Sequence, residues 1–161
     1  IEDEIADKKP LINVATHISD DYVSEDDLKI EIHKLINTIE DEKSFDSVKN
    51  ELEDRFGKLS EEIIIYMYNE WFEKLANKLH IEHVRETRNS IEITFPKEVV
   101  EKLDTEEIFM DAFYITTMFR FVSRGSNLII ILDTIKLEKH PIYYLVNLLN
   151  KIYDKFGKAL D

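Results

Sequence analysis

Histidines are the first side chains to consider for chemistry, because imidazole binds metals and transfers protons near neutral pH. Of the five histidines only His80 and His83 lie close together, with Glu82 between them. Two imidazoles and a carboxylate would bind Zn²⁺ if a third ligand came from elsewhere in the chain. The pair falls where a helical pattern gives way to a strand pattern, so the rings need not converge, and no HExxH motif is present. Exposed histidines at a junction are the simpler interpretation.

Adjacent carboxylates recur along the chain. Glycosidase-type catalysis needs two of them facing each other across a cleft with separated pKa values. Most pairs here fall in expected loops or at helix starts, where solvation and the helix dipole account for them. No nucleophile elbow and no Ser/His/Asp spacing is evident. The sequence therefore favours a chain without catalytic residues; a small metal-dependent hydrolase that uses His80 and His83 is the alternative. The pairs are Asp20/Asp21, Asp26/Asp27, Glu61/Glu62 and Glu106/Glu107, with Glu40, Asp41 and Glu42 as a triplet.

A more specific feature ends the second expected helix, at residues 45–56. Leu52 and Phe56 are four residues apart and point to the core, whereas Glu51 and Asp54 share an outward face. Glu51 is also spaced to pair with Arg55. This acidic ridge is either a solvated face or a docking surface for Arg or Lys of another domain, where charge-assisted bonds to carboxylate supply specificity.

Composition excludes several classes of function. The 161 residues carry 21 Lys+Arg against 34 Asp+Glu, a net charge of −13, which argues against nucleic acid as the main partner. An acidic mimic of DNA remains a further alternative. The absence of Cys excludes disulfides, thiolate zinc sites and thiol nucleophiles, and fits a reducing compartment. Three scattered Gly cannot form a phosphate-binding loop, so no cofactor is expected, and no apolar run is long enough to span a bilayer.

The chain divides into three parts in this interpretation. Residues 1–10 are charged, end in Pro10 and are predicted to be a linker or tether. Because the given chain begins without Met or a signal segment, it is interpreted as a fragment of a longer protein. Residues 11–156 are predicted to form one domain, and residues 157–161 a tail.

The elements that position these residues follow from periodicity. The first half reads as a short strand and three helices, and Ser24, Gly57 and Ser60 are the expected cap residues. The second half reads as two hairpins, each followed by a helix, with Asp104 as a cap and His140-Pro141 opening the last helix. The run at 128–132 suggests a central strand buried on both faces. The expected fold is α+β, a helical half packed with a small antiparallel β-β-α-β-β-α half. The expected segments are strand 11–18, helices 24–39, 45–56 and 61–79, strands 81–87 and 90–95, helix 105–115, strands 117–123 and 128–134, and a helix from 140 to about 156.

Taken in order, these features resemble the C-terminal (TRCF) domain of bacterial transcription-repair-coupling factors (Mfd). That domain has a helix that closes on E-L-x-D-R-F-G, and further shared positions lie in the long helix and the hairpin that follow. The resemblance is close over residues 11–95 and weak over residues 96–156. The matching residues are Glu51, Leu52, Asp54, Arg55, Phe56 and Gly57, then Ala76, Leu79 and Ile81, then Ile91, Ile93 and Phe95.

The resemblance implies a regulatory, non-catalytic domain. In that family the parent protein is a cytoplasmic ATP-driven DNA translocase that removes stalled RNA polymerase and recruits excision repair. Its C-terminal domain packs on the N-terminal module that binds excinuclease A (UvrA), and so inhibits the protein. Carried over, Glu51 and Asp54 would face basic residues of that module. Arg55 would orient Glu51, while Phe56 and Gly57 would fix the helix end.

The chain departs from the family pattern in four places. Family Pro positions are Ser24 and Ser60 here, and a Gly-rich hairpin turn is replaced by residues 88–90. The usual Leu-Gly-Ile is Leu79-His80-Ile81, which places a side chain where the family has none. These departures concern loop detail rather than the expected fold.

Overall fold

The computed structural model describes residues 11–161, which form an α+β structure, as expected. The predicted linker, residues 1–10, lies outside the described residues. None of the helices formed by residues 11–161 combines the length and apolar character that crossing a membrane requires. The elements are α2 (Asp26–Ile36), α3 (Glu42–Phe56), α4 (Glu61–Lys78), β1 (His83–Glu86), β2 (Ser90–Phe95), α5 (Lys97–Val100), α6 (Thr105–Ile115), β3 (Phe119–Arg124), β4 (Asn127–Asp133) and α7 (Pro141–Leu160).

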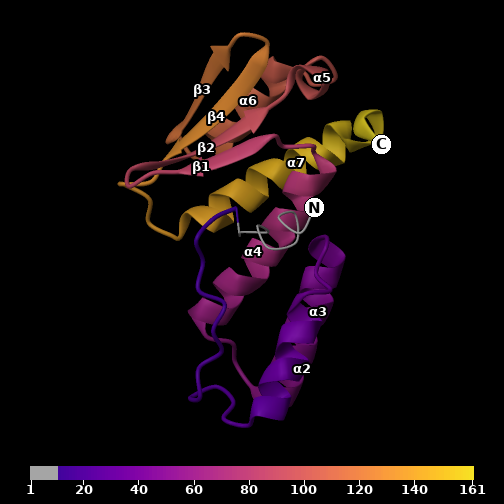
Figure 1. Ribbon diagram of the computed structural model, residues 1–161, viewed down its shortest axis with the longest axis vertical. Helices are drawn as coiled ribbons and strands as arrows, with labels where there is room; N and C mark the ends of the chain where they lie inside the picture. The colour runs from indigo at the N-terminus through magenta and orange to yellow at the C-terminus, as the bar shows by residue number, and fades with distance from the viewer. Residues whose placement is uncertain (1–10) are drawn as a thin grey trace, which may run out of the picture.

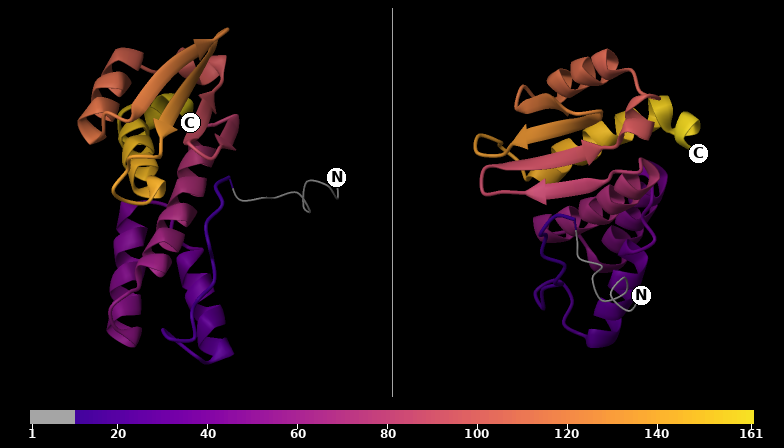
Figure 2. Two further views of the ribbon diagram at one scale, coloured as in Figure 1. Left: turned by 90° about the vertical axis from the view of Figure 1, so that its left-hand side faces the viewer. Right: turned by 45° about the horizontal axis from the view of Figure 1, so that its top comes forward.

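Helices α2 and α3 lie at one end of the molecule and the sheet at the other, and α4 runs between the two ends (Figure 1). Helix α7 packs on α4 and passes beside the sheet (Figure 2). The buried side chains of both ends belong to one contiguous hydrophobic core, in which Phe72 of α4 and Phe95 of β2 are fully buried. The two halves are therefore joined through α4 and α7 rather than by a flexible connection.

The predicted strand at residues 11–18 is wrong. The segment is extended, and Ile12, Val14 and Ile18 are buried in the core, but it pairs with no strand. Instead, the backbone N–H groups of Leu11 and Asn13 donate to carboxylates of helix α4 and strand β1, at 3.1 and 3.0 Å. The buried positions thus come from packing of an extended segment into the core, which the sequence pattern alone cannot distinguish from a strand.

Of the two N-caps predicted for helices α2 and α4, the structure confirms one. Helix α2 begins at Asp26, and its N-cap is Glu25 without a side-chain cap bond, so the predicted start at Ser24 is wrong. The predicted cap at Ser60 is confirmed, because its Oγ accepts from the N–H of Ile63 at 3.3 Å.

Helix α3 begins at Glu42, three residues before the predicted start at Phe45. Asp41 and Ser44 form a reciprocal capping box: the N–H of Ser44 donates to Asp41 Oδ1 at 2.8 Å, and the N–H of Asp41 donates to Ser44 Oγ at 3.0 Å. The bonds that the Ser44 N–H and the Ser44 hydroxyl donate to the Asp41 carboxylate lower its pKa, so it stays charged at the positive end of the helix. The predicted stop at Gly57 is confirmed by its φ of +89°.

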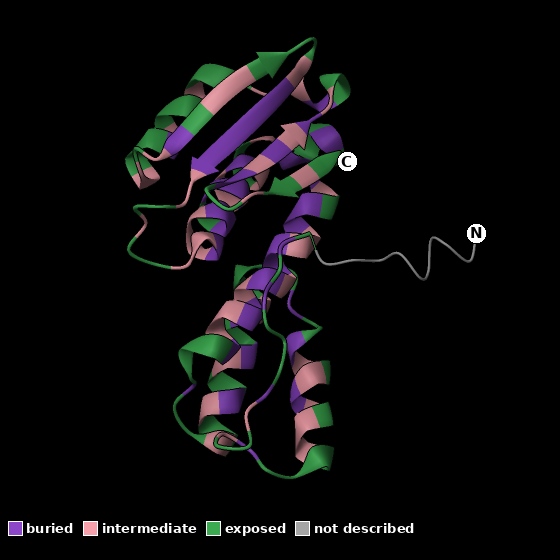
Figure 3. Cartoon of the chain, turned by 60° about the vertical axis from the view of Figure 1, so that its left-hand side comes forward, coloured by how far each residue is buried: buried purple, intermediate pink, exposed green. Residues whose placement is uncertain are grey.

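The sheet is antiparallel, with the strand order β1-β2-β4-β3. Both predicted hairpins and the central place of β4 are confirmed. Figure 3 shows β4 buried along most of its length. Ile130 joins the core, whereas Ile129 and Ile131 are buried on the opposite face, where Ile131 lies between Glu92 and Arg120 of the neighbouring strands.

The last helix is longer than expected. Helix α7 opens at Pro141 as predicted but continues to Leu160. Gly157 and Leu160 are buried, so most of the segment predicted as a tail, residues 157–161, belongs to the helix and contacts the core.

Candidate protein-interaction site on helix α3

The acidic ridge of helix α3 is exposed, as helical spacing predicted. Glu51 and Asp54 both lie on the outward side of the helix, while Leu52 between them is fully buried. Within residues 11–161, Asp54 has no ion-pair or side-chain hydrogen-bond partner, so its carboxylate charge is compensated only by solvent. The ridge can therefore accept charged hydrogen bonds from another protein without first breaking contacts at Asp54.

Arg55 lies between two carboxylates. Its Nη1 atom is 2.5 Å from Glu31 Oε2 of helix α2 and 3.4 Å from Glu51 Oε2 of its own helix. The guanidinium lowers the pKa of the Glu31 carboxyl through a side-chain hydrogen bond. Arg55 thus contacts Glu51, as the sequence predicted, but its closer partner is Glu31, so the Glu51 carboxylate is only partly neutralised.

Sequence reasoning missed Glu31. The residue lies on a different helix, twenty residues earlier than Glu51, and no spacing rule connects the two helices. The Glu31 side chain is 45% exposed, and its spacing of four residues after the exposed Asp27 is the one signal that places it on that side of α2. The acidic surface therefore extends from α3 onto α2.

The C-terminal end of α3 is held by residues from an earlier segment. The Tyr22 hydroxyl lies 3.2 Å from the carbonyl oxygen of Gly57 and 3.4 Å from that of Leu52, and donates its proton to this pair. The Tyr22 ring packs on Phe56, with centroids 6.1 Å apart. Burial, and then the Glu53 carboxylate, raise the pKa of Tyr22, so it remains a donor. The ridge is consequently fixed at both ends, by the Asp41 cap and by Tyr22.

Phe56 also supports Arg55. The Arg55 guanidinium carbon lies 4.9 Å from the centre of the Phe56 ring, within the range of a cation–π contact. Phe56 is half-buried and belongs to the layer packed against the core. The contact restrains the Arg55 side chain and, through it, the carboxylates of Glu31 and Glu51.

The histidine pair does not form a metal site. His80 has a left-handed backbone, and its Nε2 lies 3.3 Å from the carbonyl oxygen of Leu160, whereas His83 begins strand β1 and is exposed. Across residues 11–161, no group of three His, Cys, Asp or Glu side chains is arranged to hold a metal ion. The metal-dependent alternative therefore has no support in this part of the chain.

Three comparisons with known proteins agree. A family model described as the TRCF domain matches residues 12–106. The transcription-repair-coupling factor of Staphylococcus haemolyticus (strain JCSC1435) is 25% identical over 103 residues, which cover 61% of this chain and 8% of that protein's length. A solved structure described as the C-terminal domain of transcription-repair coupling factor superposes with a TM-score of 0.76 at 19% identity, covering 92% of each chain.

Proposed function

The chain belongs to the TRCF domain family, and from that membership we propose that it is a regulatory, non-catalytic domain of a bacterial transcription-repair-coupling factor. In this proposal the parent is a cytoplasmic DNA translocase, and the chain packs on the module of the parent that binds excinuclease A. The contact hides that module until the parent engages a stalled RNA polymerase. The chain spans less than a tenth of the relative it matches, so these roles concern a protein much larger than the chain.

The proposal rests chiefly on the exposed, incompletely neutralised carboxylates of Glu51 and Asp54. Carboxylates bind guanidinium and ammonium groups through short, charge-assisted hydrogen bonds. Asp54 has no ion-pair partner within residues 11–161, and Arg55 lies closer to Glu31 than to Glu51. A basic surface that approaches α3 would find both groups available.

The fixed helix makes this surface suitable for recognition. Because the Asp41 capping box and the Tyr22 contact hold the two ends of α3, the carboxylates are positioned before a partner arrives. Preorganised groups lose less conformational entropy on binding. An autoinhibitory contact must also open, so a small polar interface that exchanges between closed and open states suits this role better than a large apolar one.

The test replaces Glu51 and Asp54 with Ala in the parent protein. Removing both carboxylates should shift the parent toward the open state and raise its apparent affinity for excinuclease A by about tenfold, which corresponds to about 1.4 kcal/mol. A binding titration with purified excinuclease A measures the change. The matched control is Glu98→Ala with Glu101→Ala, because it removes the same charge from exposed positions without ion-pair partners among residues 11–161, at the other end of the molecule.

Two results would count against the proposal. Equal excinuclease A affinity of the parent and the Glu51/Asp54 variant would show that these residues take no part in the masking contact. An equal rise in affinity for the Glu98/Glu101 variant would mean that total charge, and not this ridge, stabilises the closed state. A salt dependence as steep as that of DNA binding, with competition by duplex DNA, would favour the DNA-mimic alternative.

A further inference from the structure

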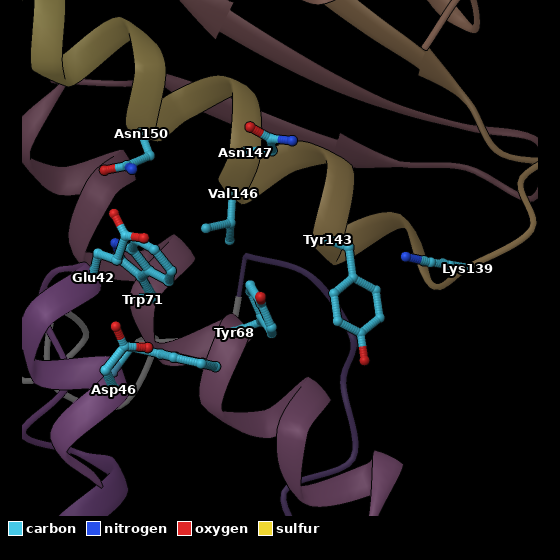
Figure 4. Close-up of a pocket in the computed structure, with 10 residues that line it drawn as sticks. Glu42, Asp46, Tyr68, Trp71, Lys139, Tyr143, Val146, Asn147 and Asn150 are labelled. Atoms are coloured by element: carbon cyan, nitrogen blue, oxygen red, sulfur yellow. The ribbon is translucent and has the colours of Figure 1, made fainter. Parts of the chain in front are cut away.

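A concave surface lies between helices α3, α4 and α7, apart from the acidic ridge. The cavity measures about 340 Å³. Aromatic rings from all three helices line it, namely Phe45, Tyr68, Trp71 and Tyr143. Figure 4 shows Tyr68, Trp71 and Tyr143 beside polar groups from α3 and α7. Glu51 does not line this groove; it borders a separate cavity beside α2.

The rings form a connected aromatic wall. The centroids of Tyr68 and Trp71 are 5.9 Å apart with nearly parallel planes, and Tyr143 meets Tyr68 edge-on at 4.7 Å. The Phe45 ring packs against Tyr68, with centroids 4.7 Å apart. Aromatic faces carry partial negative charge and attract cations. The wall is thus suited to a cationic or planar group more than to an anion.

Two carboxylates stand at one end of this wall. Glu42 and Asp46 are four residues apart on α3, both are exposed, and neither has an ion-pair partner within residues 11–161. Burial, and then the charges of Asp46 and Glu42, raise the pKa of Tyr68, so their field reaches the aromatic wall. The groove therefore combines aromatic faces with two uncompensated negative charges, a combination that binds guanidinium and ammonium groups.

The same groove has unused hydrogen-bonding groups. Trp71 is 5% exposed, and its indole Nε1 is buried without an acceptor, which is uncommon for a donor in a folded protein. Trp71 lies at the end of the groove that holds Glu42 (Figure 4). The side-chain amides of Asn147 and Asn150, from adjacent turns of α7, make no hydrogen bond among the described residues. Peptide N–H and C=O groups are natural partners for such amides.

We propose that this groove binds an extended, basic segment of a protein partner. A Lys or Arg side chain enters beside Tyr68 and Tyr143, with its charge between Glu42 and Asp46. Asn147 and Asn150 bond the segment's backbone. A nucleic acid has the wrong charge for these carboxylates. The inference goes beyond the regulatory role proposed above, because it uses different carboxylates of α3 and a different side of the helix.

Lys139 defines the orientation of the segment. It lies near Tyr143, at the end of the groove away from Glu42 and Asp46 (Figure 4). Its ammonium group would repel a second cation there and attract an acidic or C-terminal carboxylate. The groove therefore prefers a segment with one basic residue beside a neutral or acidic one over a run of consecutive basic residues.

The chain contains a single tryptophan, and that residue is Trp71. Its indole N–H gives one side-chain signal in a ¹H–¹⁵N spectrum, and its fluorescence reports the groove alone. The probe is the peptide acetyl-Gly-Ser-Arg-Ser-Gly-amide, titrated into the 161-residue chain. The matched probe replaces Arg with citrulline, which keeps the shape and loses the charge. We expect the Arg peptide to shift the indole signal saturably, and the citrulline peptide to bind at least about tenfold more weakly.

Matched variants separate the groove from total charge. Glu42→Gln combined with Asp46→Asn should weaken binding of the Arg peptide by about tenfold. Glu98→Gln combined with Glu101→Gln removes the same charge at the other end of the molecule and should leave the peptide affinity unchanged. Circular dichroism checks that each variant remains folded. Equal binding of both peptides, an unmoved indole signal, or an unchanged affinity of the Glu42/Asp46 variant would overturn the proposal.

Two further outcomes distinguish other occupants. An indole shift that depends on protein concentration without peptide would mean that a second copy fills the groove, and would overturn the proposal. A larger indole shift with the peptide that has Glu in place of Arg would mean that Lys139 determines which charge the groove binds, and would also overturn the proposal. Neither result affects the test of Glu51 and Asp54, so failure of the two proposals can be told apart.

Discussion

The phenol oxygen of Tyr22 lies 3.2 Å from the carbonyl oxygen of Gly57, so a residue in the turn before helix α2 closes the end of helix α3. The last carbonyls of a helix lack partners within the helix and need donors from elsewhere. Here the donor lies thirty-five residues earlier in the chain. The geometry of the acidic ridge consequently depends on a segment that carries none of its carboxylates.

Replacing Tyr22 with Phe should lower the free energy of unfolding by about 1 kcal/mol, because it removes one hydrogen bond and keeps the ring packed on Phe56. Urea denaturation measures the change. Tyr114→Phe is the matched control, since Tyr114 is 87% exposed and should show almost no effect. Equal stabilities of the two variants would mean that the Tyr22 contact contributes nothing.

Substitutions at His80 should separate backbone strain from side-chain contact. His80 has a φ of +55° and follows α4 in a Schellman motif, in which the N–H of Ile81 donates to the carbonyl of Ala76 at 3.0 Å. Both His80→Gly and His80→Ala lose the contact with Leu160, but only Ala retains the left-handed strain. His80→Gly should therefore be more stable than His80→Ala by about 1 kcal/mol.

Thermal unfolding of the two His80 variants tests this order. Asn77 provides the control, because it is exposed inside the last turn of α4, where Gly should be less stable than Ala. If Ala matched Gly at position 80, the segment would not require a left-handed residue there.

The stability of the start of α7 should depend on pH through His140. Its Nδ1 accepts the N–H of Ile142 at 3.1 Å, which requires the neutral ring. Burial lowers the pKa of His140 below 6.5, despite the opposing charges of Glu86 and Glu61. As the pH falls through 6.5, His140 of the unfolded chain takes up a proton before His140 of the folded chain. The stability that the neutral His140 cap contributes is therefore present above pH 6.5 and is lost as the pH falls toward the lower pKa of the folded state.

His140→Asn should reduce this loss, because an Asn side chain caps the helix without titrating in that range. The measurement compares the free energy of unfolding at pH 7.5 and about pH 5.5 for both proteins. Contributions from carboxylates are common to both and cancel. An identical decrease in the two proteins would show that the His140 cap does not titrate with folding.

Local signals predicted much of the fold. Ser60, Asp104 and Gly57 were identified as caps because each acts on backbone within a few residues, and all three do so in the structure. Asp41 was missed because its partner at the third helical position is Ser44, where the common capping box has Glu or Gln. Distance along the chain thus decided which features were predictable.

The same limit applies to the sites. The exposure of Glu51 and Asp54 follows from helical spacing. The contact of Glu31 with Arg55 requires knowing how α2 lies against α3, which no periodicity provides. Tyr68 lies within the predicted helix 61–79, but its contact with Tyr143 depends on the packing of α4 on α7. The aromatic groove could therefore be found only in three dimensions.

The strand order has a consequence for how the chain folds. Each hairpin joins neighbours in sequence and can form early, but the pairing of Ile93 with Ile130 spans two helices and a strand. Pairing β2 with β4 costs loop-closure entropy before the contacts between the two strands form, which makes this pairing a slow step in folding. Residues at the β2–β4 pairing should therefore control the folding rate, whereas the carboxylates of α3 bind partners only after the native structure has formed.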